Sequence, residues 1–129
     1  MSTGALGVGV DIVETSRIRD SLEKFGPRFR NRVFTPDEQA YCDARPDPVI
    51  HYAARFAAKE AVSKAFGTGI GAQLGWLDIE IYKEPGSGAP FVRLRGKGAD
   101  LLQACGGRAM LVSLSHTHDY AAAAAVLTA

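Results

Sequence analysis

The stretch Arg55-Phe56-Ala57-Ala58-Lys59-Glu60-Ala61-Val62-Ser63-Lys64-Ala65-Phe66, followed by Gly67, decides how the rest of this chain is arranged. It lies in the longest helical pattern of the sequence, which opens at Pro48 and ends at Gly67. Alanines recur at helical spacing along one stripe, at Ala54, Ala58, Ala61 and Ala65. Because alanine is small, another element can approach the backbone closely along that stripe. The pattern predicts a long helix with a close neighbour.

Glu60 is the residue of this helix with the clearest chemical possibilities. It lies with Phe56 on a face beside the alanine stripe and forms an i, i+4 pair with Lys64. A solvated surface ion pair is the simplest interpretation, because such pairs are common and contribute little. A second acid, Asp11, favours a different interpretation, in which Glu60 belongs to a binding site. Asp11 interrupts an apolar run, residues 6–13, that predicts a buried strand, where a carboxylate needs a partner or a metal unless it reaches solvent.

Length and charge limit the classes of function. A chain of 129 residues and 13.7 kDa predicts a single domain spanning residues 1–129. A net charge of +1 gives no overall attraction to nucleic acid or to a membrane, so neither partner is expected. Residues 17–32 nevertheless carry six basic residues against two acidic ones. That local patch is either a solvated helix face or a surface for an acidic partner.

Cysteine usage and hydropathy bear on localisation. Cys42 and Cys105 have no metal-ligand spacing and are typical of thiols in a reducing compartment. The chain has no run of about eighteen apolar residues and no apolar leader at its N-terminus. These features predict a cytoplasmic protein.

The order of the expected elements indicates the fold class. Strands are expected at residues 6–13, 76–83, 90–94, 109–115 and 120–127, and helices at 15–25, 35–43, 48–67 and 96–105. Most helices precede most strands, which favours an α+β domain with a mainly antiparallel sheet packed on the long helix. Gly7-Val8-Gly9 does not indicate a dinucleotide-binding fold, because Ile12 occupies the position of the third glycine.

Asp11 and Glu60, with lysines next to the second acid, suggest a magnesium site that also holds phosphate. Magnesium commonly takes one or two protein carboxylates and completes its coordination with water and substrate phosphates. Lys59 and Lys64 could then bind phosphate oxygens. No spacing rule places Asp11 beside Glu60, so this remains a hypothesis.

Three motifs resemble those of a known family. They are Gly7-x-Gly9-x-Asp11-Ile12-Val13-Glu14 followed by Arg17-Ile18, then the stretch from Arg55 to Gly69, then Ser113-x-Ser115-His116-Thr117. In order and spacing they resemble the bacterial holo-acyl-carrier-protein synthases, which are small 4′-phosphopantetheinyl transferases. The resemblance covers nearly the whole chain, and the Lys59-Glu60-Ala61-x-x-Lys64-Ala65 helix is its most specific part.

The resemblance implies an activity and a set of site residues. The reaction would transfer 4′-phosphopantetheine from coenzyme A to a serine of apo acyl carrier protein and release adenosine 3′,5′-bisphosphate, a step that serves fatty acid biosynthesis. Asp11 and Glu60 would ligate Mg²⁺, and Lys64 would neutralise phosphate charge. The residues implied at the coenzyme are Arg55, Lys59, Lys64, Gly67, Thr68, Ser115, His116 and Thr117. Arg17, Arg28 and Arg32 would dock the acidic carrier protein, and a homotrimer would share each site between subunits.

Several alternatives stay open. The proton acceptor could be Glu60, a metal-bound water or His116, and His116-x-His118 has a zinc-like spacing but no third ligand. A catalytically silent module that binds carrier proteins would use the same arginines without magnesium. A metal-dependent nucleotide phosphohydrolase would use the same acids and lysines to activate water.

Overall fold

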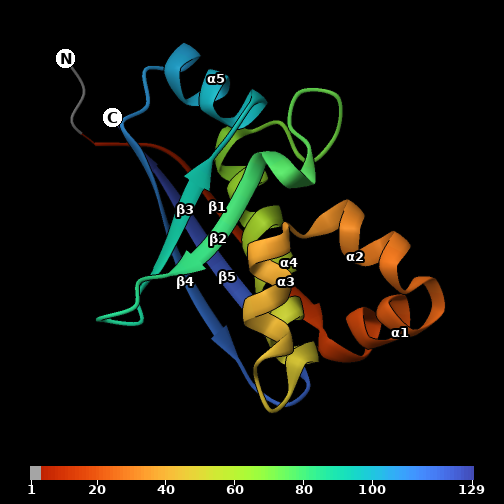
Figure 1. Cartoon of the computed structure of the whole chain (residues 1–129). Coiled ribbons are helices and arrows are strands. Elements are labelled where there is room, and N and C mark those ends of the chain that lie inside the picture. The colour runs from red at the N-terminus through yellow and green to blue at the C-terminus, as the bar shows by residue number, and fades with distance from the viewer. Residues whose placement is uncertain (1–3) are drawn as a thin grey trace.

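The long helix α4 (Pro48–Phe66) packs across one face of a three-stranded sheet. A computed structural model describes residues 4–129. The sheet order is β1 (Ala5–Glu14), β5 (Tyr120–Thr128) and β4 (Ala109–His116), antiparallel throughout, with β5 in the middle (Figure 1). The expected α+β class, with antiparallel strands against one long helix, is confirmed. Gly67 ends α4 with a positive φ of 80°, as expected for a helix-terminating glycine.

Two of the remaining helices and one strand of a second sheet also pack against α4, and the other elements lie further out (Figure 1). The other helices are α1 (Thr15–Phe25), α2 (Pro27–Val33), α3 (Pro36–Asp43) and α5 (Lys97–Ala104). The expected hairpin forms from β2 (Ile79–Lys83) and β3 (Pro90–Leu94), but residues Trp76–Asp78 before it form a short 3₁₀ helix, η1. Helix α2 was not expected, because Pro27 was interpreted only as the end of α1. It also serves as the first residue of a new helix.

Two glycines allow β1 to lie directly on α4. A Cβ atom at Gly7 would overlap the carbonyl oxygen of Ala65, and one at Gly9 would overlap that of Ala61. Both carbonyls belong to the alanine stripe of α4, which is buried. The glycines of the Gly7-x-Gly9 motif therefore fit this close approach of strand and helix and have no part in phosphate binding in a dinucleotide fold.

Replacing Gly9 by alanine should destabilise the protein by up to about 3 kcal/mol, because the added methyl group pushes β1 away from a rigid helix backbone. Urea denaturation would measure the change in the free energy of unfolding. Gly86→Ala is the matched control, since a Cβ there meets nothing within 4 Å and should leave stability nearly unchanged. Equal stability of Gly9→Ala and the control would contradict this account of the packing.

β1 is buried on one face only, so the expectation of a fully buried strand is wrong. Its second face exposes Val8, Val10 and Ile12, with exposed fractions of 71%, 66% and 66%. Leu111 of β4 lies on the same face, because the register aligns Leu111 and Val8 with the same residue of β5. The sheet thus presents an apolar face opposite α4.

Both cysteines are free thiols. Cys42 is buried, and burial raises the pKa of its thiol to about 12, while Cys105 is exposed. Within residues 4–129 we find no helix with the length and apolar character needed to cross a membrane.

Candidate active site

Asp11, Glu60 and Lys64 meet where β1 lies on α4. The Lys64 Nζ atom lies 3.1 Å from Asp11 Oδ1 and donates to the carbonyl oxygen of Val10 at 3.0 Å. Side-chain exposure is 18% for Asp11 and 50% for Lys64, so solvent and ligands can reach both. Lys64 therefore pairs with Asp11 on the strand, and the simple Glu60–Lys64 surface pair is not the arrangement observed.

Glu60 lies one helical turn before Lys64 and is partly buried. Burial, followed by the neighbouring Asp11 carboxylate, raises the pKa of Glu60, while Lys64 and Arg17 act to lower it. Gly9, two residues before Asp11, lies directly against Ala61, the residue after Glu60, so β1 carries Asp11 to the part of α4 that carries Glu60. Two acids that the sequence separates by almost fifty residues thus share one site.

The two carboxylates fit a magnesium ion with an incomplete protein shell. Oxygen ligands from one or two acids are typical of Mg²⁺ sites that are completed by water and phosphate. Among the described residues, no group of three or more His, Cys, Asp or Glu side chains could hold a metal. Asp11 and Glu60 could hold a metal ion whose remaining ligands are water and phosphate.

Arg55 belongs to a second cluster, formed by α3, α4 and the end of β4. Its guanidinium carbon lies 4.1 Å from the centroid of the Tyr41 ring, and the residue is 1% exposed. Its Nε and Nη2 atoms are buried and have no hydrogen-bond partner in the described part of the chain. The adjoining pocket, of about 190 Å³, is lined by Asp37, Glu38, Tyr41, Arg55, Ile81, Tyr82 and Lys83. An unpaired buried guanidinium needs an acceptor, and an anionic ligand can supply it.

His116 joins this second cluster through His51. The centroids of the two imidazole rings lie 5.7 Å apart, and the His51 ring lies 5.9 Å from the Tyr41 ring. The sequence analysis named His116 and Arg55 but missed His51 and Tyr41. His51 could have been found from its position one turn before Arg55 on the same face of the helix.

The two clusters are separated within one chain. His116 of β4 and Val13 of β1 both pair with Ala121 of β5, on its opposite sides. Strands lie about 4.8 Å apart, so the backbones of β4 and β1 are roughly 10 Å apart. Asp11 lies two residues before Val13 on β1. The structure therefore divides the expected coenzyme residues between two clusters. We call them the carboxylate cluster (Asp11, Glu60 and Lys64) and the arginine–histidine cluster (Tyr41, His51, Arg55 and His116).

The other residues implied at the coenzyme lie around these clusters. Gly67 and Thr68 follow α4 within one turn of Lys64, and the Thr68 hydroxyl donates to the carbonyl oxygen of Gly69 at 2.9 Å. The Thr117 hydroxyl accepts the backbone N–H of Tyr120 in the turn after β4. Strand alternation places Ser115 on the face of the sheet opposite His116, so the structure does not bring Ser115 to either cluster.

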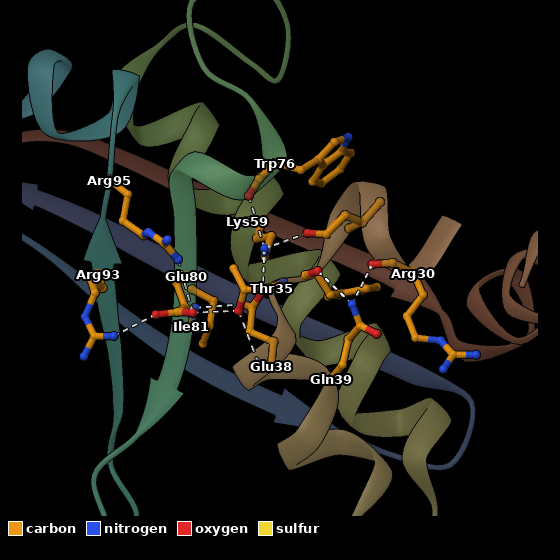
Figure 2. Close-up of polar contacts among 12 residues, drawn as sticks. Arg30, Thr35, Glu38, Gln39, Lys59, Trp76, Glu80, Ile81, Arg93 and Arg95 are labelled. Carbon is orange, nitrogen blue, oxygen red and sulfur yellow. Dashed lines mark hydrogen bonds and ion pairs between the residues drawn. The ribbon is translucent and has the colours of Figure 1, made fainter. Parts of the chain in front are cut away.

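Lys59 lies in the protein interior, where its ammonium group is enclosed by groups of neighbouring elements (Figure 2). Its Nζ atom lies 2.7 Å from Glu38 Oε1 and donates to the carbonyl oxygens of Val33 at 2.7 Å and Trp76 at 3.1 Å. Burial lowers the pKa of Lys59, and the Glu38 carboxylate acts in the opposite direction. The role at the nucleotide implied for Lys59 does not fit this position, because all of its described contacts join α4 to neighbouring elements.

The expected docking arginines line two hollows. Arg28 and Arg32 line a hollow of about 260 Å³ together with Phe25 and Phe29. Arg17 lines another with residues of β1 and β5, and its charge acts on Glu60. All three arginines are exposed. The surface is therefore basic with apolar side chains between the charges.

Comparison with known proteins defines the class. Residues 7–125 match the model of the 4′-phosphopantetheinyl transferase superfamily. The holo-[acyl-carrier-protein] synthase of Koribacter versatilis is 48% identical over 122 residues, covering 95% of this chain and 97% of the relative. That of Moorella thermoacetica is 50% identical over 122 residues, covering 95% and 93%.

Solved structures of the same family share the fold. The synthase of Neisseria meningitidis matches with a TM-score of 0.90 and 34% identity, over 97% of this chain and 99% of that one. The Helicobacter pylori synthase, solved in complex with coenzyme A, matches with a TM-score of 0.83 and 33% identity, over 94% and 99%. This chain belongs to the holo-[acyl-carrier-protein] synthase family of phosphopantetheinyl transferases. The expected family and enzyme class are confirmed.

Proposed function

We propose that this chain transfers 4′-phosphopantetheine from coenzyme A to a serine hydroxyl of apo acyl carrier protein, with Mg²⁺, and releases adenosine 3′,5′-bisphosphate. The observation that carries the proposal is the meeting of Asp11, Glu60 and Lys64 at one accessible point. Two carboxylates beside an ammonium group suit a metal-bound pyrophosphate. Solved relatives include complexes with coenzyme A from Helicobacter pylori and with "CoA (3',5'-ADP)" from Bacillus anthracis.

Each residue of the carboxylate cluster has a distinct part in this proposal. Asp11 and Glu60 would hold Mg²⁺, which supplies positive charge to the pyrophosphate when bound. Lys64 places its ammonium group beside Asp11, where it can stabilise the negative charge that collects on the departing bisphosphate. The serine oxygen forms the new bond to phosphorus, and its proton needs an acceptor. Among the chain's own groups, Glu60 and His116 are the candidates for that role.

Arg55 and His116 would bind a phosphate of coenzyme A at some distance from the reacting bond. The unpaired guanidinium nitrogens of Arg55 support this assignment. Gly67, Thr68 and Thr117 would lie at the edges of the coenzyme. Lys59 is assigned a structural part instead, because its ammonium group is enclosed.

Product analysis tests the proposal against the alternatives. Chromatography should find adenosine 3′,5′-bisphosphate only when apo carrier protein is present with coenzyme A and Mg²⁺. A phosphohydrolase would release free phosphopantetheine without any carrier protein, and a silent binding module would release neither product. Either of these results would overturn the proposed transfer.

Arg17, Arg28 and Arg32 would dock the acidic carrier protein. Converting Arg28 and Arg32 to Glu should raise the KM for the carrier protein about tenfold at low salt and leave kcat unchanged, because opposite charges steer and hold the partner. The difference should shrink as salt is added. Arg108→Glu, at an exposed arginine beside β4, is the matched control. An unchanged KM at low salt would place the docking surface elsewhere.

A homotrimer would cover the apolar face of the sheet and bring the two clusters of neighbouring chains together. Val8, Val10 and Ile12 are more exposed than is usual for apolar residues gathered on one face, which supports a second copy as the occupant. Sedimentation equilibrium should give three times the 13.7 kDa chain mass, and a monomer mass would contradict it. We also propose that residues 1–129 form one transferase domain that works in the cytoplasm, consistent with two free thiols.

A further inference from the structure

We propose that His51 is an additional phosphate-binding residue, which takes up a proton when the ribose 3′-phosphate of coenzyme A binds and so distinguishes coenzyme A from its dephospho form. The inference deepens the proposed function and rests on its placement of coenzyme A. It starts from a half-buried histidine that the carboxylate cluster does not use.

The geometry places His51 at the centre of the arginine–histidine cluster. Its ring packs edge-to-face against His116, at 5.7 Å between centroids, and against Tyr41, at 5.9 Å. Arg55 follows one helical turn later, and its buried Nε and Nη2 atoms have no partner among the described residues. Thus four side chains that can donate hydrogen bonds pack next to one another, and one of them is a buried cation without an acceptor among the described residues.

The charged neighbours of His51 come from four parts of the fold. The charges with the largest effects on the pKa of His51 are those of His116 of β4, Arg55 of α4, Arg45 of the α3–α4 connection and Lys83 of β2. Every one of them is basic. Together with burial, which has the largest effect, they lower the pKa of His51, so the ring is neutral in the free protein at neutral pH.

A bound phosphate dianion reverses this balance. Negative charge beside His51 raises the pKa of the imidazole, and the protonated ring can donate a charge-assisted hydrogen bond to phosphate oxygen. Coenzyme A carries two kinds of phosphate. Its pyrophosphate is taken by the carboxylate cluster and Lys64 in the proposed reaction, on the other side of the sheet's central strand. The 3′-phosphate is the group left for the arginine–histidine cluster.

Isothermal titration calorimetry can measure the proton uptake that accompanies the binding of coenzyme A. Coenzyme A should be titrated into the protein with Mg²⁺ at pH 7.5, in two buffers of different ionisation enthalpy. A phosphate monoester has a second pKa near 6, so it is already a dianion at this pH and proton uptake reports on the protein. The wild-type protein should take up protons with coenzyme A but not with dephospho-coenzyme A. His51→Phe, which keeps an aromatic ring, should take up measurably fewer.

Steady-state kinetics give a second readout. His51→Phe should raise the KM for coenzyme A about tenfold at pH 7, the loss expected for one charge-assisted hydrogen bond, with kcat unchanged. The KM for dephospho-coenzyme A should change less than about twofold. In the wild type the KM for coenzyme A should rise with pH as the bound imidazole loses its proton, and this rise should be weaker in the variant. His118→Phe, an exposed histidine in the turn after β4, should behave as wild type.

Two results would overturn the role of His51. One is the same proton uptake in His51→Phe as in wild type, and the other is an equal loss of affinity for coenzyme A and its dephospho form. A failure of the proposed function would look different. A silent binding module would bind neither coenzyme in the presence of Mg²⁺, and a phosphohydrolase would release free phosphopantetheine without any carrier protein.

Discussion

Lys59→Met lowers the free energy of unfolding by about 3–5 kcal/mol in this account, because it leaves the carboxylate of Glu38 buried without its cation. Glu38 is 1% exposed and lies 2.7 Å from the Lys59 ammonium group. Two backbone carbonyls would lose their donor as well (Figure 2). Denaturation in urea at pH 7 measures the loss.

Two further variants separate a structural from a ligand-binding role. Lys59→Met combined with Glu38→Gln should recover part of the stability, since the buried charge is then removed. Lys64→Met, at the exposed lysine of the same helix, should change stability by less than about 1 kcal/mol while it impairs turnover. If Lys59→Met kept wild-type stability but raised the KM for coenzyme A, the role implied by the family resemblance would be correct and ours wrong.

Glu60→Gln should reduce magnesium-dependent turnover at least about 100-fold, the size of effect seen when one preorganised charged or polar group is removed from a reacting centre. A neutral amide cannot balance the charge of a hard cation, although it has nearly the same shape as the carboxylate. The folded protein should keep its stability without metal, because the substitution removes a partly buried charge beside Asp11. Turnover measured across Mg²⁺ concentrations, together with urea denaturation, checks both parts.

Glu84→Gln is the matched control for this variant, since Glu84 lies exposed in the β2–β3 turn. It should leave turnover and stability unchanged. Full magnesium-dependent activity in Glu60→Gln would remove Glu60 from the metal site and would leave Asp11 as its only assigned protein ligand.

Local patterns predicted most of the fold because each of its elements has strong local signals. Thr35 and Glu38 form a capping box at the start of α3, where a helix was expected, and Gly67 ends α4. What local patterns could not predict is which face of a strand another chain element covers. β1 has apolar residues on both sides, so nothing in residues 6–13 distinguished the glycine face, which meets α4, from the exposed valine face.

The residues of the site also divide into those that the sequence predicted and those that it did not. The motif resemblance named Asp11, Glu60 and Lys64, and the structure places them together. It also implied that Lys59 lines the nucleotide, and we propose a structural role for Lys59 instead, because its ammonium group is enclosed. Neighbouring positions on a helix point about 100° apart, so Lys59 faces the interior while Glu60 faces β1. His51 lies one helical turn before Arg55, which was the available sequence signal, but its contact with His116 joins positions 65 residues apart and is visible only in the structure.

The most direct test of the account is the intact mass of an apo acyl carrier protein after incubation with this protein, coenzyme A and Mg²⁺, with a chelator in a parallel sample. We expect the carrier protein to gain the mass of one phosphopantetheine group, and we expect that gain to disappear with the chelator. No gain, on a carrier protein that another transferase can modify, would contradict the proposed activity. A gain that survives the chelator would contradict the magnesium site at Asp11 and Glu60.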